Sequence, residues 1–159
     1  MIFVAVGTQK FQFNRLLKAV DDLVEQGCLE GEVFAQIGHS DYVPRKYAYK
    51  DFISKDDFQA CIDRCELLIT HSGVATIITG LKLEKPVVVV PRLAKFGEHV
   101  DDHQFQIAES FSTKNLLLMC KEQDNLADIV QEAKDHIFAE YVSQREKMIG
   151  TIREYLEKI

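Results

Sequence analysis

The chain has 159 residues, of which 47% are apolar, and it carries a formal net charge of −6 at pH 7. This length and apolar content suit one globular domain, 1–159, with a full core. The acidic balance excludes the basic stripe that nucleic-acid binding needs. No apolar run approaches the roughly 20 residues that span a bilayer, and the apolar start MIFVAV lacks the charged flank and the length of a signal peptide. We therefore expect a soluble, cytoplasmic protein.

Apolar runs alternate with helical patterns in the first part of the chain. Residues 2–6 form a continuous apolar run typical of a strand covered on both faces. From Phe13, Leu and Val recur at three- and four-residue spacing until Gly27 ends the predicted helix. Residues 33–37 predict a second short strand, and residues 47–52 are predicted to pair at the sheet edge.

The alternation continues to the C-terminus and predicts the fold class. The remaining predicted elements are a helix at 56–64, a strand at 66–70, a helix from the following turn to about 83, a strand at 87–90, a loop at 92–100, a helix at 101–111, a strand at 115–119 and two final helices. Such alternation predicts an α/β fold with a Rossmann-like, mostly parallel sheet and helices on both faces. Since ligands bind beyond the carboxyl ends of such strands, the loops at 7–9, 70–76 and 91–103 are expected on one rim.

The stretch LLITHSGVATIIT, residues 67–79, has the pattern of a strand, a tight turn and a helix N-terminus. The first N–H groups of a helix have no internal partner and carry partial positive charge, so a phosphate is the natural occupant. Ser72 or Thr70 is expected to cap the helix, and Gly73 lets a ligand approach the backbone. Two interpretations of His71 stay open: a hydrogen-bonded side chain packed under the turn, or a ligand contact.

Two further loops carry candidate residues. The sequence VGTQ contains Gly7 and Thr8 after the first strand and forms either a plain turn or part of a ligand site. The sequence GEHVDDHQFQIA brings polar side chains to the start of a helix, namely His99, Asp102, His103 and Gln104. These residues suit a solvated first turn or a hydroxyl-rich ligand. His99 and His103 also have a spacing that could hold zinc on one helical face, although no third ligand is evident.

Three segments together resemble a known family. FVAVGT, HSGVATIITGLKLEKPVVVVPR and EHVDDHQFQIA look like the C-terminal, donor-binding half of a GT-B glycosyltransferase of the family 28 type. As a free-standing chain, it is similar to the soluble subunit of the two-part N-acetylglucosaminyltransferase that acts on dolichol-linked sugar. It resembles more closely the soluble subunit of bacterial two-component galactosyltransferases of capsule and exopolysaccharide synthesis.

The resemblance implies roles for individual positions. By resemblance, Gly7 and Thr8 would face the donor and the acceptor, and the backbone at Phe52 and Ile53 would hold the uracil ring. The phosphate-binding turn would be formed by Ser72, Gly73, Val74, Ala75 and Thr76. His103 and Gln104 would contact the donor sugar. Two positions depart from the pattern. Thr79 stands where many members carry a glutamate that binds the ribose hydroxyls, and Ala75 stands where a second glycine is common. A hydroxyl binds ribose less strongly than an ionised carboxylate.

The resemblance also implies a missing half. The chain is expected to bind a UDP-sugar, with UDP-galactose the expected donor, and to be inactive without a membrane-associated subunit that resembles the N-terminal half. That partner would recruit the chain to the inner membrane face, bring the lipid-linked acceptor and remove its proton, with His71 or His103 assisting. No metal or cofactor is implied, since the helix N-terminus would stabilise the departing diphosphate.

A C-terminal helix at about 139–158 is predicted from apolar residues at roughly helical spacing. These residues are Phe138, Val142, Ile149, Ile152, Leu156 and Ile159. They suit either contact with the partner or packing on the chain's own domain.

Two other functions are open from the residues. A non-catalytic module would bind a nucleotide sugar or stabilise the partner. A hydrolase would use Ser72 beside His71, although the flanking residues do not form G-x-S-x-G.

Overall fold

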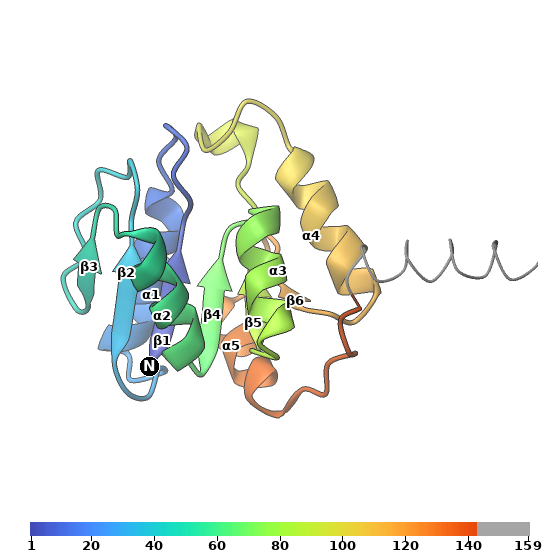
Figure 1. The fold of residues 1–159 in the computed structure, drawn as a ribbon. Helices are drawn as coiled ribbons and strands as arrows, with labels where there is room; N and C mark the ends of the chain where they lie inside the picture. The colour runs from blue at the N-terminus through green and yellow to red at the C-terminus, as the bar shows by residue number, and fades with distance from the viewer. Residues whose placement is uncertain (143–159) are drawn as a thin grey trace, which may run out of the picture.

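The computed structural model describes residues 1–142 and contains one parallel sheet with helices on both faces (Figure 1). Its elements are β1 (Ile2–Ala5), α1 (Asn14–Glu25), β2 (Val33–Gln36), β3 (Ala48–Lys50), α2 (Lys55–Arg64), β4 (Leu67–Thr70), α3 (Val74–Lys82), β5 (Val87–Val89), the 3-10 turn η1 (Ala94–Phe96), α4 (His103–Thr113), β6 (Leu118–Met119) and α5 (Leu126–Asp135). The Rossmann-like α/β class predicted from the alternating pattern is confirmed.

The sheet order places the start of the chain at its centre. The order is β3-β2-β1-β4-β5-β6, and each neighbouring pair is parallel. The sheet therefore grows outward from β1 in one direction through β2 and in the other through β4. Ligands bind such sheets outside the carboxyl ends at this reversal point, which here lies between Ala5 of β1 and Thr70 of β4.

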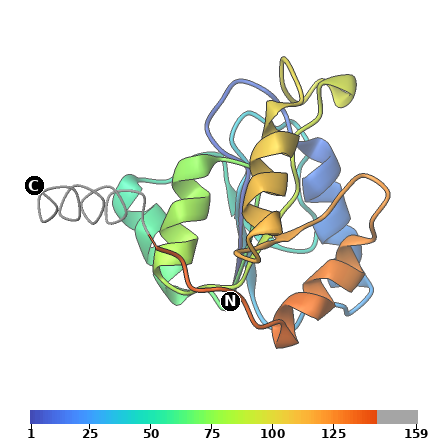
Figure 2. The ribbon, with the colours of Figure 1, turned by 90° about the vertical axis from the view of Figure 1, so that its right-hand side faces the viewer.

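Helices cover both faces of the sheet (Figure 2), and an apolar layer lies between the sheet and the helices on each face. Successive residues of a strand point to opposite faces, so Val4 packs with α1 and α5 while Phe3 packs with α2, α3 and α4. Both side chains are fully buried. This double coverage explains why the strands are continuous apolar runs rather than alternating ones.

Capping residues account for several helix ends. The Ser54 hydroxyl accepts a hydrogen bond from the Asp57 N–H at 3.1 Å and starts α2, and Asn125 starts α5 in the same way. Each such cap contributes about 1 kcal/mol. Gly27, with φ +72°, follows the end of α1. In contrast, the N-cap residue of α3 is Gly73 and no side chain caps this helix, so the predicted capping by Ser72 or Thr70 is wrong.

Some predicted boundaries also differ. The helix at 101–111 begins two residues later, at His103, and the strand at 115–119 is only Leu118–Met119. Residues 139–142, where the final helix was predicted to start, are not helical, and the rest of that prediction lies outside the described residues. Within 1–142, no helix is both long enough and apolar enough to cross a membrane.

Candidate functional site

The three predicted loops converge at the carboxyl ends of β1, β4 and β5. The turn at His71 lies at the end of β1, where the His71 N–H donates to the Ala5 carbonyl at 3.2 Å, and its ring lies against Gly7 of the β1 loop. The β5 loop joins the β1 loop through the Gln12 side-chain amide, which donates to the Phe96 carbonyl at 2.9 Å. The prediction that these loops form one rim is therefore confirmed.

The His71 ring lies between two glycines. A Cβ atom at Gly7 would be 2.6 Å from His71 Nε2, and a Cβ atom at Gly73 would be 2.5 Å from the same nitrogen. Any side chain at either position would displace the ring. Gly7 also has φ +86°, a left-handed conformation that favours glycine. The spacing between the two loops thus depends on both glycines and on the imidazole.

Gln104 fixes the tautomer of His71. The Gln104 Oε1 atom accepts hydrogen bonds from the backbone N–H groups of Ser72 at 3.2 Å and Arg92 at 3.1 Å. The amide nitrogen therefore faces His71 Nδ1, 3.1 Å away, and donates to it. The remaining ring proton of the neutral imidazole is then on Nε2, the atom facing Gly7 and Gly73.

Burial keeps His71 uncharged. The side chain is 7% exposed, and burial together with the nearby Arg92 cation lowers the pKa of His71 to about 3. With Nδ1 occupied and a proton on Nε2, the imidazole can donate a hydrogen bond but has no free lone pair. This geometry favours the interpretation of His71 as a hydrogen-bonded residue under the turn and argues against a role as catalytic base.

The turn itself retains unused hydrogen-bonding capacity. The first N–H groups of α3 precede the first internal hydrogen bond, which runs from Ile77 to the Gly73 carbonyl. The Ser72 hydroxyl is buried and has no hydrogen-bond partner within residues 1–142. An unpartnered buried hydroxyl next to free N–H groups is unusual in a folded protein. A bound anion would satisfy both.

The other residues of the predicted phosphate turn lie on the first turn of α3. Val74 and Ala75 are exposed, and Thr76 is half-buried. Thr79 lies one turn further, and its hydroxyl donates to the Ala75 carbonyl at 2.8 Å. The Thr79 oxygen keeps its lone pairs, so it can accept a hydrogen bond from a ligand hydroxyl, but its proton is already engaged.

Phe52 and Ile53 lie at the far side of the rim, after β3. The Phe52 ring is 47% exposed and contacts the ring of His39 with centroids 5.1 Å apart. The Ile53 N–H donates to the Gln36 side chain at 2.9 Å, so this backbone donor is already in use. Sequence reasoning did not single out His39, which follows Gly38 at the carboxyl end of β2.

The residues of GEHVDDHQ separate into two groups. Gln104 is buried beneath the turn rather than beside an exposed ligand surface, which differs from the sugar contact implied by resemblance. Thr8, Asp102 and His103 are exposed. His99 lies in the loop before α4, so His99 and His103 do not share a helical face as the zinc interpretation requires. Within residues 1–142, no group of three or more His, Cys, Asp or Glu side chains could hold a metal.

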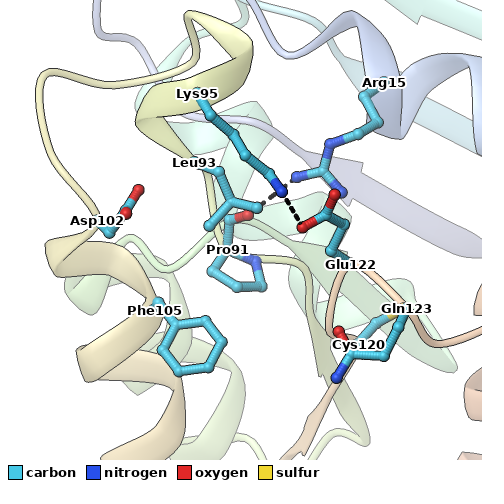
Figure 3. A pocket seen from close by; sticks show the side chains of 9 residues that line it. All are labelled: Arg15, Pro91, Leu93, Lys95, Asp102, Phe105, Cys120, Glu122 and Gln123. Carbon is cyan, nitrogen blue, oxygen red and sulfur yellow. Dashed lines mark hydrogen bonds and ion pairs between the residues drawn. The ribbon is translucent and has the colours of Figure 1, made fainter.

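A separate pocket of about 210 Å³ lies on the same rim, at the carboxyl ends of β5 and β6 (Figure 3). Its lining residues are Arg15, Pro91, Leu93, Lys95, Asp102, Phe105, Cys120, Glu122 and Gln123. Lys95 and Glu122 form an ion pair across it. Of the predicted site residues, only Asp102 lines this pocket, and its carboxylate already accepts the Ala94 N–H at 2.9 Å.

Two buried charged residues lie behind the rim and were not among the site residues predicted from the sequence. Arg92 and Glu98 are each 1% exposed, and Glu98 pairs with Arg15 at 2.9 Å. The available signal was an arginine placed directly after the apolar run VVVVP, since arginine is almost never fully buried without partners.

Nearly the whole chain matches a known protein family. Residues 1–157 match the family described as glycosyltransferase family 28 C-terminal domain. The chain is 27% identical to the human UDP-N-acetylglucosamine transferase subunit ALG13 over 126 residues, which cover 75% of this chain and 11% of that protein. It is 33% identical over 75 residues to the subunit of the same name from Yarrowia lipolytica, covering 46% and 36%. The chain thus spans about a third or less of these relatives.

Solved structures show the same fold. The NMR structure of ALG13 superposes with a TM-score of 0.60 at 19% identity, covering 92% of this chain and 91% of that chain. The glycosyltransferase SnogD from Streptomyces nogalater superposes with a TM-score of 0.62 at 18% identity, covering 84% and 34%.

These matches decide the family and leave the branch within it open. The relatives described are eukaryotic UDP-N-acetylglucosamine transferase subunits, so the comparisons do not single out the bacterial galactosyltransferase subunits that the sequence motifs resemble more closely. The match over residues 1–157 means that the chain belongs to the glycosyltransferase family 28 C-terminal domain family.

Proposed function

We propose that this chain binds a UDP-sugar and is the donor-binding half of a two-component glycosyltransferase. The observation that carries the proposal is the uncapped N-terminus of α3 beside the buried, unpartnered hydroxyl of Ser72. Free N–H groups and the helix dipole stabilise a diphosphate, and the charge that develops on the leaving UDP would be stabilised most. The family membership supports this assignment.

In this proposal, the rim supplies positioning and electrostatic stabilisation rather than proton transfer. Gly7 and Thr8 would lie opposite the acceptor, and the half-buried His99 and the exposed Asp102 and His103 would face the sugar hydroxyls. His71 would hold Gly7 and Gly73 in place beneath the diphosphate, with Nδ1 bonded to Gln104 and Nε2 facing both glycines. The base that deprotonates the acceptor would come from the partner.

The proposal also covers the partner, the acceptor and the sugar, which the family membership alone does not specify. A membrane-associated subunit resembling the missing N-terminal half would bring a lipid-linked acceptor and hold the chain at the cytoplasmic membrane face. The motif resemblance favours galactose in capsule or exopolysaccharide synthesis, whereas the relatives' names specify N-acetylglucosamine. Exposed loop residues would distinguish the two donors.

Calorimetric titration tests the donor site. UDP, UDP-galactose, UDP-glucose and UDP-N-acetylglucosamine are titrated into the wild type and into Gly73→Asp. The wild type should bind UDP and prefer one of the sugars. Gly73→Asp should lose binding by about a hundredfold or more, because a carboxylate would repel the diphosphate and displace His71.

Gly27→Asp is the matched control for Gly73→Asp. It adds the same charge at a left-handed glycine with no heavy atom within 4 Å of its Cβ position, at the end of α1 away from the rim. The control should bind UDP as the wild type does. Silence of the wild type with all four nucleotides contradicts the donor-site proposal.

A transfer assay with the co-expressed partner tests the catalytic half. Gly73→Asp should abolish transfer, and His103→Ala should reduce it by about tenfold if this exposed side chain contacts the sugar. Undiminished transfer by both variants would instead support a non-catalytic module that stabilises the partner. Release of UDP in the absence of any partner would favour the hydrolase.

Thr79 gives a second measure of nucleoside binding. A glutamate at this position should strengthen UDP binding by a few-fold, because an ionised acceptor bonds more strongly to ribose hydroxyls than a threonine whose proton is engaged. The gain should vanish with 2′-deoxy-UDP. An equal gain with both nucleotides would place Thr79 away from the ribose.

A further inference from the structure

Arg92 connects the rim loops from beneath. It follows β5, and its guanidinium donates to carbonyl oxygens of both loops. The acceptors are Phe11, Gln12 and Glu98, each 3.1 Å from Nη1, and Val6, which accepts from Nη2. The guanidinium also lies 5.0 Å from the centroid of the Phe13 ring. A single buried side chain therefore organises the backbone on both sides of the β1 loop.

An ion pair between Arg15 and Glu98 holds this arrangement in place. Glu98 accepts from Arg15 through both carboxylate oxygens, at 3.0 and 2.9 Å, and from the Leu93 N–H at 3.0 Å. Arg15 donates further to the Pro91 carbonyl at 3.1 Å. The carboxylate is fully buried, so these contacts are needed to offset its desolvation.

The network is continuous with the candidate donor site. Val6, whose carbonyl Arg92 holds, directly precedes Gly7. The Arg92 N–H shares the Gln104 oxygen with the Ser72 N–H, and the same amide orients His71. Arg92 is thus linked to both segments that enclose the imidazole. Its side chain bonds to the β1 loop, and its backbone N–H shares an acceptor with the turn at Ser72.

Charge alone does not account for an arginine here. Burial lowers the pKa of Arg92 to about 10, so the side chain stays protonated at neutral pH. A lysine would also be charged, but its ammonium donates from one point, whereas the planar guanidinium reaches several acceptors in a fixed fork. Because the acceptors lie in the β1 loop and in the β5 loop, several N–H groups of a planar guanidinium are needed to reach them.

We propose that Arg92 is a positioning residue that sets the conformation of residues 7–12 and thereby shapes the diphosphate side of the site. The inference rests on the proposed function, because the diphosphate is the ligand assigned there. Arg92 does not itself contact the ligand. Its effect is to hold Gly7 against His71 before the ligand arrives, which lowers the ordering cost of binding.

Three variants separate geometry, charge and general stability. Arg92→Lys keeps the charge and loses the fork, and Arg92→Met loses both. Asp21→Asn is the matched control, because Asp21 is also buried and accepts from the Tyr42 hydroxyl at 2.6 Å and from the Arg45 and Lys46 N–H groups, each at 2.9 Å. It pins residues 42–46 rather than the β1 loop.

Chemical-shift titration by NMR with UDP and with uridine provides the readout. Arg92→Lys and Arg92→Met should each weaken UDP by about tenfold or more and leave uridine unchanged. Asp21→Asn should leave both affinities unchanged. Without ligand, the Gly7 and Thr8 amide signals should move in both Arg92 variants and stay in place in Asp21→Asn. Should the Arg92 variants fail to fold, Glu98→Gln should give the same pattern with smaller changes.

Several outcomes overturn the inference. Wild-type UDP affinity in Arg92→Lys together with a loss in Arg92→Met would make the charge, not the fork, responsible. An equal loss for UDP and uridine would indicate general destabilisation. A wild type that binds no UDP contradicts the proposed function. The ligand-free amide signals would then still decide whether Arg92 shapes the loop, and unmoved Gly7 and Thr8 signals would exclude it.

Discussion

The turn at Ser72 and the pocket at Lys95 lie on the same rim, but polar groups of the pocket already have partners, whereas those of the turn do not. In the pocket, Lys95 pairs with Glu122, and Arg15 bonds to the Pro91 carbonyl and to the buried carboxylate behind it. At the turn, the Ser72 hydroxyl is buried without a hydrogen-bond partner within residues 1–142, and α3 has no side-chain cap.

This difference favours the turn over the pocket as the place where a polar ligand would gain most. A pocket whose charged groups already pair gains little from a new polar ligand, because existing interactions must first be broken. A turn with free donors gains the full interaction. The following changes test that contrast, beginning with the largest expected effect.

Gly7→Ala should disrupt the turn most. The added Cβ would lie 2.6 Å from His71 Nε2, and the left-handed φ of +86° is strained for alanine. We expect a loss of roughly 2 to 5 kcal/mol in the free energy of unfolding, combining backbone strain of about 1–2 kcal/mol with overpacking of about 1–3 kcal/mol. Urea unfolding measures the loss.

Gly31→Ala is the control for this experiment. Gly31 has φ +82°, but nothing lies within 4 Å of its Cβ position. Gly31→Ala should therefore lower the free energy of unfolding only by the backbone strain, about 1–2 kcal/mol. Equal losses in the two variants would mean that the contact between Gly7 and His71 contributes nothing.

Gln104→Leu should have the next largest effect. The change removes the acceptor shared by the Ser72 and Arg92 N–H groups and the donor to His71. Each buried group left without a partner costs about 1–3 kcal/mol, partly relieved by water. UDP binding should weaken by about tenfold as the ring loses its fixed orientation. Unchanged binding with reduced stability would separate the turn from the ligand site.

The pH dependence of stability tests the burial of His71. Its pKa is about 3 in the folded state against 6.5 when unperturbed, so the unfolded state binds more protons below pH 6.5. Stability is therefore full above that pH and falls as the pH decreases toward 3, by up to about 1.4 kcal/mol per unit. Between pH 6.5 and 5, the wild type should lose roughly 2 kcal/mol more than His71→Gln. Parallel curves would indicate a solvated imidazole.

The fold was predictable because its signals are local. Continuous apolar runs such as residues 2–6 identify doubly covered strands, and their alternation with helical patterns specifies a parallel sheet. The boundaries were less accurate where tertiary contacts decide them. β6 is only Leu118–Met119 because its two residues pair with β5 alone at the sheet edge.

The place of the HSG turn in the fold was predictable from the sequence, but the contacts around it were not. The motif HSG identified the turn, whereas the separation of Gln104 from the exposed His103 depends on which side of α4 faces the sheet. Two of the Arg92 contacts join residues more than 80 positions apart in the sequence: Phe11 with a separation of 81 and Val6 with a separation of 86. Spacing within one motif carries no information about such a pair.

The pocket supplies the smallest expected effect. Lys95 and Glu122 are 57% and 44% exposed, so their ion pair is screened by solvent and contributes at most about 1 kcal/mol. The double variant Lys95→Met with Glu122→Gln should change the free energy of unfolding by less than that and leave UDP affinity unchanged within twofold, as urea unfolding and calorimetry can measure. A tenfold loss of UDP binding would move the ligand from the turn to the pocket, and the pairing of its charges would then have to break on binding.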